Sequence, residues 1–254
     1  MGIRVVCILA LAALLPFPVA FAEEEGIGEK VSPEAKALVE EVVRKLGGEK
    51  FTAIESIAYK GRYFSIGRGG TAGFVPFESQ AVYPAKRRFS YGNKKPIILI
   101  NDGERGWRLD RLGRARQSAD QIRAWRLRGR YNLYHLLGKV VNEPDILMIQ
   151  AGSDFIDNVA VRVVEIMDTQ QVQVKLYVDK ERLLPVRISY RFRHAETKRW
   201  VEVAQTYGNF QMRGGVMTPL QEARWTNGRR TAEVFDDRIL YNAPVKETAF
   251  LPQR

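Results

Sequence analysis

The sequence has few of the residues that build metal centres and thiol sites. It contains one cysteine, Cys7, and two histidines, His135 and His194, among 254 residues. Because Cys7 lies in the apolar N-terminal leader, removal of that leader excludes disulfides, thiolate metal sites and a cysteine nucleophile. Two histidines in unrelated segments cannot hold zinc without carboxylate ligands, so we interpret both as surface side chains. No metal and no cofactor is expected.

Familiar catalytic motifs are absent as well. The sequence has no Gly-x-Ser-x-Gly elbow, no phosphate-binding loop with its lysine and no His-Glu-x-x-His pair. Residues 67–72 loosely match a dinucleotide fingerprint, but a strand pattern follows instead of a helix N-terminus, so we expect a hairpin loop. Asp236 and Asp237 fall on opposite sides of an expected strand and are interpreted as a solvated strand end. The chain is therefore not expected to be an enzyme.

The N-terminus has the layout of a secretory signal peptide. Arg4 precedes an apolar stretch from Val5 to about Leu15, and small residues lead to a cleavage site after Ala22. The stretch is too short to span a bilayer, which takes about 20 apolar residues, and Cys7 lies too early to attach a lipid. We expect a soluble periplasmic protein with three parts: a signal peptide (1–22), a flexible lead (23–31) and a single domain (32–254).

The charge balance is strongly basic. Forty lysines and arginines face 29 acidic residues, which gives a formal net charge of +11. In an exported protein this excess indicates contact with phospholipid head groups, lipopolysaccharide or acidic cell-wall polymers instead of nucleic acid.

Helical patterns occur in two regions. Ser32 can cap a helix whose apolar residues recur at helical spacing until Gly47. A second helical pattern runs from Ser118 to about Leu137, and we expect Gly129 to kink or divide it. A shorter helical piece is expected from Pro144 to Gln150. The second region predicts a helical lid over residues about 117–150.

Most of the remaining chain has the two-residue period of β-strands. The joints are too short for crossover helices, so an antiparallel meander is expected. In two late strands the apolar side chains face one way and the basic ones the other. The expected strands are Ile57–Phe64, Phe74–Tyr83, Lys86–Tyr91, Pro96–Asn101, Gly106–Asp110, Gln171–Asp179, Val186–Arg193, Arg199–Tyr207, Val216–Asn227 and Arg229–Leu240.

Nine arginines gather between Arg105 and Arg130, around Trp107 and Trp125. This composition can bind phosphates or lie at a membrane surface. It is equally typical of a solvated helix face on which arginine stems cover apolar surface. The sequence leaves both interpretations open.

A strand ending in Val178-Asp179, a charged turn at 180–182 and the strand beginning Leu184-Pro185-Val186-Arg187 resemble the LolA/LolB superfamily of periplasmic lipoprotein carriers, of the outer-membrane lipoprotein-sorting type. Segments 215–219, 242–245 and 250–252 agree with it in order. The resemblance implies a mostly β (α+β) fold: a curved, unclosed antiparallel half-barrel whose concave apolar face is covered by helices and receives acyl chains. The missing lipid-attachment cysteine favours the soluble carrier over its anchored acceptor.

The leading hypothesis is a monomeric periplasmic carrier or binding protein for an acylated anionic amphiphile, either a lipoprotein or a free lipid. Its transfer partners would lie in the inner and outer membranes, with peripheral membrane contact. Head groups are expected near Arg123, Arg126, Arg128 and Arg130. The candidate lining residues are Phe89, Tyr91, Ile98, Ile100, Trp107, Val174, Leu176, Ile188, Tyr190 and Phe192 from the sheet, with Ile122, Trp125 and Leu133 from the lid.

An alternative from another class is a scaffold, regulatory or sensor domain whose sheet is filled solid. Such a domain would bind a partner protein or an anionic polymer through its basic face, with strong salt dependence.

Overall fold

The computed structural model describes residues 30–67 and 70–253. The expected signal peptide and residues 23–29 of the expected flexible lead lie outside this range. The last two residues of that lead are held in place. Val31 forms a parallel bridge with Met148, and the Lys30 ammonium lies 2.6 Å from the Asp145 carboxylate. Residues 30–31 of the expected lead therefore lie against the edge strand of the domain.

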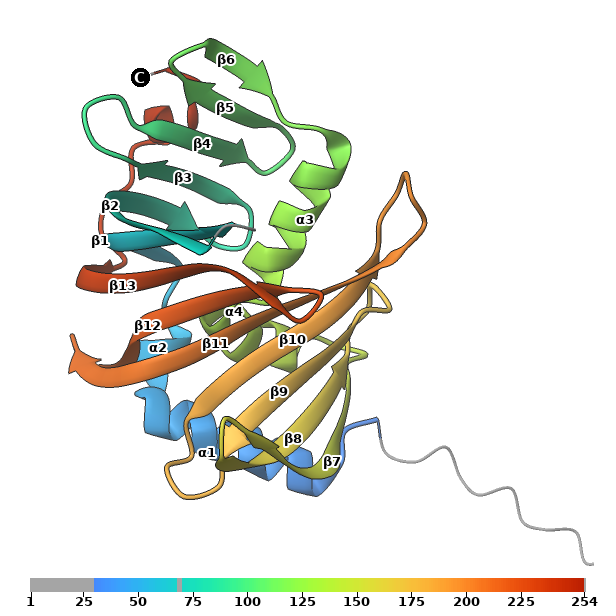
Figure 1. The fold of residues 1–254 in the computed structure, drawn as a ribbon. Helices are drawn as coiled ribbons and strands as arrows, with labels where there is room; N and C mark the ends of the chain where they lie inside the picture. Colours follow the sequence, from blue (N-terminus) through green and yellow to red (C-terminus); the bar gives the residue numbers. More distant parts are fainter. Residues whose placement is uncertain (1–29, 68–69, 254) are drawn as a thin grey trace, which may run out of the picture.

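The described residues form one antiparallel sheet of thirteen strands (Figure 1). The strands are β1 (Ser56–Gly67), β2 (Gly70–Val82), β3 (Lys86–Tyr91), β4 (Ile97–Asp102), β5 (Gly106–Asp110), β6 (Gly113–Arg116), β7 (Leu147–Ile156), β8 (Val159–Met167), β9 (Gln173–Asp179), β10 (Pro185–Arg193), β11 (Trp200–Arg213), β12 (Val216–Thr226) and β13 (Arg229–Tyr241).

The strands follow the order β6-β5-β4-β3-β2-β1-β13-β12-β11-β10-β9-β8-β7. Every neighbouring pair is consecutive in the chain except β1 and β13, which join the two halves of the sheet. The edge strands β6 and β7 do not pair with each other, so the sheet stays open. The predicted unclosed antiparallel half-barrel is confirmed, as is the hairpin between β1 and β2, in which Gly67 pairs with Gly70.

Helices cover one face of this sheet. They are α1 (Pro33–Leu46), α2 (Glu49–Thr52), α3 (Ala119–Arg130) and α4 (Leu133–Gly138), followed by a 3-10 turn, η1 (Val140–Asn142). The Ser32 hydroxyl accepts a hydrogen bond from the amide of Ala35 and begins α1, and Ser118 with Gln121 forms the expected capping box of α3. Figure 1 shows α1 at the β7–β9 end of the sheet and α3 toward the β3–β6 end.

The expected helix at Pro144–Gln150 is wrong, because this segment enters the edge strand β7. Met148 is buried while Leu147 and Ile149 are exposed, which is the two-residue period of a strand. The segment is too short for its apolar residues to separate the two periods in the sequence.

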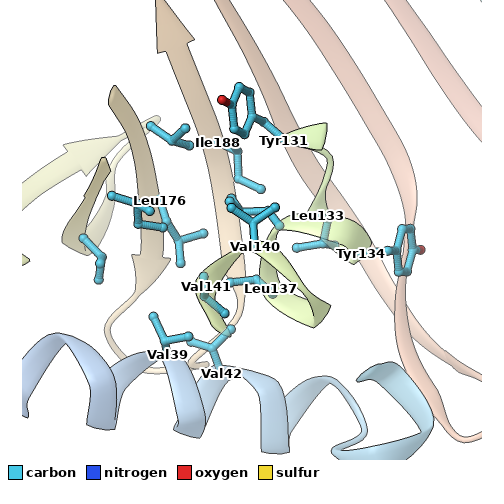
Figure 2. Close-up of a cluster of buried hydrophobic side chains, with 14 of the residues drawn as sticks. Val39, Val42, Tyr131, Leu133, Tyr134, Leu137, Val140, Val141, Leu176 and Ile188 are labelled. Atoms are coloured by element: carbon cyan, nitrogen blue, oxygen red, sulfur yellow. The ribbon is translucent and has the colours of Figure 1, made fainter. Parts of the chain in front are cut away.

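A solid core fills the concave side over β8, β9 and β10. Figure 2 shows Leu137 and Val140 lying between Val42 of α1 and the strand residues Leu176 and Ile188. All five side chains are almost fully buried. This half of the half-barrel is therefore filled by the protein's own side chains.

A C-terminal 3-10 turn, η2 (Glu247–Phe250), packs on the opposite face of the sheet. Its Phe250 contacts a small apolar cluster on β4 and β5, and the Arg88 guanidinium donates to the carbonyl oxygen of Gln253 at 3.1 Å. The C-terminal segment therefore seals the convex face of β3–β5.

Candidate functional site

The structure separates the predicted lining residues into four groups. Val174, Leu176, Ile188 and Phe192 belong to the solid core. Phe89, Trp125, Leu133 and Tyr190 surround or adjoin a cavity beneath α3. Tyr91 lines an open groove on the same face, and Ile122 is half-buried on α3.

The fourth group lies on the opposite face of the sheet. Ile98, Ile100 and Trp107 pack against Phe250 on the convex side, so they are not lining residues. The register explains this placement. Leu99 pairs with Phe89 and faces the helices, so its neighbours Ile98 and Ile100 must face away. The sequence shows which residues alternate, but it does not show which face of one strand matches that of the next.

We call the cavity beneath α3 the inner cavity. Strands β1–β3 and β11–β13 enclose it together with α3 and α4, and its volume is about 50 Å³. That space admits a few water molecules or one small polar group, and it is too small for an acyl chain. Six charged residues line it: Lys86, Arg87, Arg128, Arg224, Glu222 and Asp236.

Arg87 is the most enclosed of the three guanidinium groups, with 7% of its surface exposed. Its Nε donates to the Ser79 hydroxyl at 2.7 Å, and its guanidinium carbon lies 5.4, 4.8 and 5.1 Å from the ring centres of Tyr59, Phe89 and Trp125. Burial lowers the pKa of Arg87, while nearby tyrosines and Glu222 partly offset this effect. The aromatic rings and the hydroxyl together fix one orientation of the guanidinium.

Arg128 and Arg224 approach the inner cavity from the lid side and the sheet side. Burial, and then the positive charge of Arg224, lower the pKa of Arg128 to about 10. The Tyr190 hydroxyl lies near both arginines, and burial raises its pKa to about 12 although their charges act in the opposite direction. Of the four arginines predicted to bind head groups, Arg128 is the one that reaches the inner cavity.

Asp236 is buried in this cavity, with 7% of its surface exposed. Its interpretation as a solvated strand end is therefore wrong, although it does face away from the exposed Asp237. Burial, reinforced by the negative charge of Glu222, raises the pKa of Asp236 to about 8 against the attraction of Arg87 and Arg224. Burial also raises the pKa of Glu222. The Asp236 carboxyl therefore carries a proton at neutral pH.

A shift in strand register brings Asp236 into the cavity. The pairing of β1 with β13 changes between Lys60 and Gly61. At Gly61 a side-chain Cβ would lie 2.0 Å from the carbonyl oxygen of Phe235, so only glycine allows the two strands to approach this closely.

The cavity contains several buried atoms without a partner. In the described part of the chain, buried polar atoms that make no hydrogen bond include Nη2 of Arg87, Nε of Arg224, Nε1 of Trp125, the hydroxyl of Tyr190 and Oδ1 of Asp236. Buried polar groups are normally satisfied, so this concentration marks the cavity as the unusual part of the interior.

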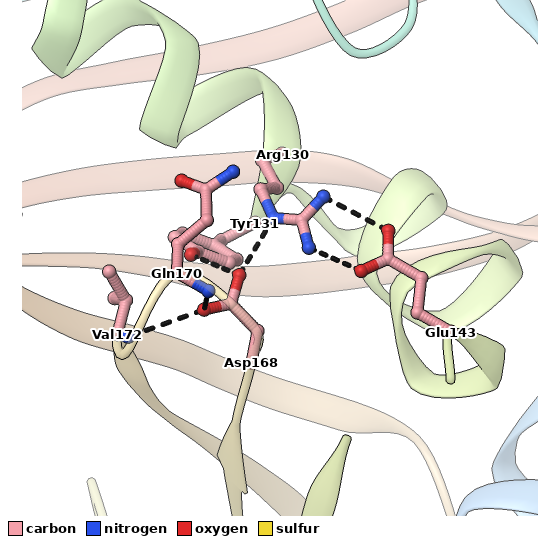
Figure 3. A network of polar contacts seen from close by, with 6 residues as sticks. All are labelled: Arg130, Tyr131, Glu143, Asp168, Gln170 and Val172. Atoms are coloured by element: carbon pink, nitrogen blue, oxygen red, sulfur yellow. Dashed lines mark hydrogen bonds and ion pairs between the residues drawn. The ribbon is translucent and has the colours of Figure 1, made fainter. Parts of the chain in front are cut away.

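An ion-pair network anchors the C-terminal end of α3 (Figure 3). The Arg130 Nε donates to Asp168 at 2.7 Å, its terminal nitrogens form two hydrogen bonds with Glu143, and the Tyr131 hydroxyl donates to Asp168 at 2.6 Å. Asp168 also accepts the amide of Val172 at 3.2 Å. Two carboxylates thus pair with Arg130, which links α3 to the β8–β9 turn.

The remaining contacts of α3 are mostly polar. Asp120 lies 3.2 Å from His194 and accepts the Ala195 amide at 3.1 Å, so the β10–β11 hairpin holds the start of the helix. Arg126 donates to the Gly103 carbonyl oxygen at 2.6 Å. Arg123 is exposed, and Leu127 is the only fully buried residue of α3. The helix therefore lies across the concave face with little apolar surface buried beneath it.

Gly129 allows the close approach of α3 to the sheet. A Cβ at this position would lie 1.8 Å from the carbonyl oxygen of Pro84, between β2 and β3. Contrary to our expectation, Gly129 does not divide the helix. The helix runs on to Arg130, and the break follows at Tyr131 and Asn132, where the Asn132 side chain caps α4.

The larger opening on the concave face, which we call the outer groove, has a volume of about 1030 Å³. Its apolar and aromatic lining includes Tyr63, Val75, Tyr91 and Ile97, and the rings of Tyr63 and Tyr91 lie 5.0 Å apart. Its basic lining consists of Lys94, Lys95, Arg108 and Arg111. The groove therefore combines an apolar surface with positive charge.

Phe89 connects the outer groove to the inner cavity. Its ring centre lies 5.4 Å from that of Tyr91 in the groove and 4.8 Å from the Arg87 guanidinium in the cavity. Arg87, Phe89 and Tyr91 alternate along β3 and share the concave face. The two spaces therefore lie along one continuous wall.

Sequence reasoning missed Arg87, Arg224, Glu222 and Asp236 as site residues. A signal was available, because Arg87 is in phase with Phe89 and Tyr91 on a strand whose other face is packed as well. A charged residue that shares one face of an expected strand with aromatic residues indicates a buried polar site.

Among residues 30–67 and 70–253, no group of three or more His, Cys, Asp or Glu side chains is arranged to hold a metal ion. Within the same residues, no helix combines the length and apolarity that crossing a membrane requires.

No family model matches the chain, and no curated protein matches it in sequence. Several solved structures match it in fold. A DUF1329 family protein from Desulfovibrio piger superposes with a TM-score of 0.55 at 10% identity, over 86% of this chain and 97% of that one. A LolA superfamily protein from Nitrosomonas europaea gives 0.52 at 12% identity, over 85% and 97%.

A domain from Vibrio parahaemolyticus, described as an outer membrane lipoprotein-sorting protein, gives a TM-score of 0.52 at 10% identity, over 85% of this chain and 96% of that one. At such low identity the likeness bears on the architecture alone. It agrees with the open thirteen-stranded sheet and the helices across its concave face, and it confirms the resemblance seen in the sequence: the chain has the LolA-like fold.

Proposed function

We propose that this protein is a periplasmic binding or carrier protein for an acylated anionic amphiphile, held on the concave face of the half-barrel. The client is a lipid or the acyl chains of a lipoprotein. The observation that carries the proposal is the outer groove, because its volume of about 1030 Å³ and its apolar lining suit an acyl chain, while its lysines and arginines suit an anionic head group.

The distribution of filled and empty space revises where the cargo binds. The apolar face of β8–β10, which the sequence suggested as the lining, is occupied by α1 and α4. The open aromatic surface lies instead on the β1–β4 half of the sheet. The predicted lining came from both early and late strands; the proposal keeps the acyl chain on the early strands, with Tyr91 retained from the predicted set, and removes it from the late ones.

Helix α3 is the lid in this proposal. It buries one residue fully, Leu127, and is held mainly by polar contacts at its two ends. Elements with few buried apolar contacts are those that open most readily. Movement of α3 would extend the outer groove toward the inner cavity.

The lipoprotein-sorting description of the Vibrio parahaemolyticus domain suggests the same class of cargo for this chain. The proposal also includes a periplasmic location, which the predicted signal peptide would give, action as a monomer, and membrane-bound donors and acceptors of the cargo.

A pair of neighbouring substitutions on β2 tests this proposal. Val75 lines the outer groove, whereas Phe74 points to the other side of the strand and is 58% exposed. We expect Val75→Glu to weaken the binding of a monoacylglycerol and of a lysophospholipid by at least about tenfold, since it places a charge against the chain. Phe74→Glu, the matched control, should bind like the unmodified protein.

Binding is measured by isothermal titration calorimetry at amphiphile concentrations below micelle formation. If the unmodified protein binds neither amphiphile, or if both substitutions have the same effect, the outer groove is not the binding site.

A further inference from the structure

The inner cavity presents hydrogen-bond donors that its own walls leave unused. Nη2 of Arg87, Nε of Arg224 and Nε1 of Trp125 are all buried, and each is a donor without an acceptor in the described chain. A buried donor in this state is unfavourable until an acceptor is supplied. The three donors come from β3, β12 and α3, so they converge on the cavity from three sides.

The charges in the cavity do not cancel. Three guanidinium groups face two carboxyl groups; within the described residues no ion pair of 4.0 Å or less joins them, although the charges of Arg87 and Arg224 act on both carboxyls. Since burial and the charge of Glu222 raise the pKa of Asp236 to about 8, this carboxyl is protonated at neutral pH and can donate a hydrogen bond. The cavity therefore has a positive excess and is enclosed in a low-dielectric interior, which strengthens attraction for an anion.

We propose that the inner cavity is an anion-binding site that takes one phosphate or carboxylate group, with Arg87, Arg128 and Arg224 as its charged ligands. Of the four arginines that the sequence singled out, the site includes Arg128 alone. It deepens the proposed function by supplying a place for the polar end of the amphiphile, and it rests on that function only where the anion is a lipid head group.

Size and arrangement support this assignment. A volume of about 50 Å³ suits one small polar group and excludes an acyl chain. Arg87 is held in advance by Ser79 and three aromatic rings, so it needs little reorganisation to bind an anion. Arg128 belongs to the lid, while Arg87 and Arg224 belong to the sheet. A bound anion would therefore link the lid to the sheet.

The position of Phe89 shows how head and chain would divide. This ring contacts Arg87 on one side and Tyr91 on the other. A head group in the inner cavity could thus continue along the same wall into a chain in the outer groove, once α3 has moved.

Calorimetric titrations with three probes at pH 7 test the site and distinguish the two sources of the anion. The probes are inorganic phosphate, a lysophosphatidic acid, and a monoacylglycerol of the same chain length. We expect Arg224→Gln to weaken the binding of phosphate or of lysophosphatidic acid by at least about tenfold, because a charge-assisted contact is lost. The binding of the monoacylglycerol should stay unchanged. The matched control is Arg229→Gln, because Arg229 is an exposed arginine at the start of β13.

Phosphate binding that depends on Arg224 supports a site for a free anion, whereas dependence seen with lysophosphatidic acid alone supports a head-group site. The inference is overturned if Arg224→Gln changes the affinity of neither phosphate nor lysophosphatidic acid, or if Arg229→Gln weakens the binding of these two anions by the same factor. Should Arg224→Gln fail to fold by circular dichroism, Arg128→Gln replaces it on the lid. If the unmodified protein binds neither the monoacylglycerol nor lysophosphatidic acid, the proposed function is contradicted, and the titration with phosphate still tests the anion site.

Discussion

The buried carboxyl of Asp236 allows a quantitative test of the inner cavity. Its pKa is about 8 in the folded protein, against an ordinary value of 3.8. Folding therefore requires the group to take up a proton at pH values between its ordinary pKa and the raised one. Because the unfolded chain binds fewer protons than the folded one in this range, the native protein loses stability as the pH rises from about 4 to about 8, and the loss then levels off.

Asp236→Asn removes this dependence and keeps the shape of the side chain. The linkage relation sets an upper limit on the increase in the free energy of unfolding of this variant: about 2 kcal/mol at pH 5, about 4 kcal/mol at pH 7 and about 6 kcal/mol at pH 9. The amide gives up no hydrogen bond at Oδ1, since that atom has no partner in the described chain. Asp237→Asn is the matched control, because Asp237 is exposed and lies 3.4 Å from Arg62 in a surface ion pair. Its removal should cost no more than about 1 kcal/mol at any of these pH values.

Urea unfolding followed by tryptophan fluorescence at pH 5, 7 and 9 measures both differences. The expected result is a free energy of unfolding that is larger for Asp236→Asn than for the unmodified protein, with the gap widening as the pH rises. A gap that stays constant with pH, or a variant that is less stable at pH 9, would refute the assignment of a buried protonated carboxyl.

Two further predictions follow from the same geometry. Anion binding in the inner cavity should weaken by at least about tenfold between pH 7 and pH 9, because Asp236 loses its proton in this range and its negative charge opposes the ligand; calorimetry with lysophosphatidic acid measures this, and an unchanged affinity would contradict it. Gly129→Ala should push the end of α3 away from Pro84, since the added Cβ would lie 1.8 Å from the Pro84 carbonyl oxygen. We expect amide hydrogen exchange in α3 to be faster in the variant than in the unmodified protein, while exchange in α1 stays the same. Unchanged exchange in α3 would show that the helix tolerates the contact.

Much of the fold could be predicted from the sequence, because alternating apolar and polar residues and short turns indicate the strands. The five early strands were placed within a few residues of β1–β5, and the caps of α1 and α3 were read from Ser32 and Ser118. The segment around Met148 was misassigned, since it is a strand through its pairing with β8, in which Met148 lies opposite Ile166, and a single sequence does not show that pairing.

The site was harder to predict than the fold. Alternation identified Ile98 and Ile100 as members of one strand face, but the face they share with Phe250 is set by pairing across several strands. Asp236 enters the interior through a register shift at Gly61, which leaves no clear mark in a single sequence. Arg130 could not be separated from its neighbours, because its partners Glu143 and Asp168 are distant in the chain.

The central claim is that the concave face holds an acylated anionic amphiphile. Mass spectrometry of organic extracts, taken from the protein after mild purification from its own cell envelope, tests this most directly. The proposal predicts a copurifying lipid or acylated peptide with an anionic head group, close to one molecule per protein and absent from the Val75→Glu variant. An extract free of amphiphile, together with no amphiphile binding by the purified protein, would contradict it.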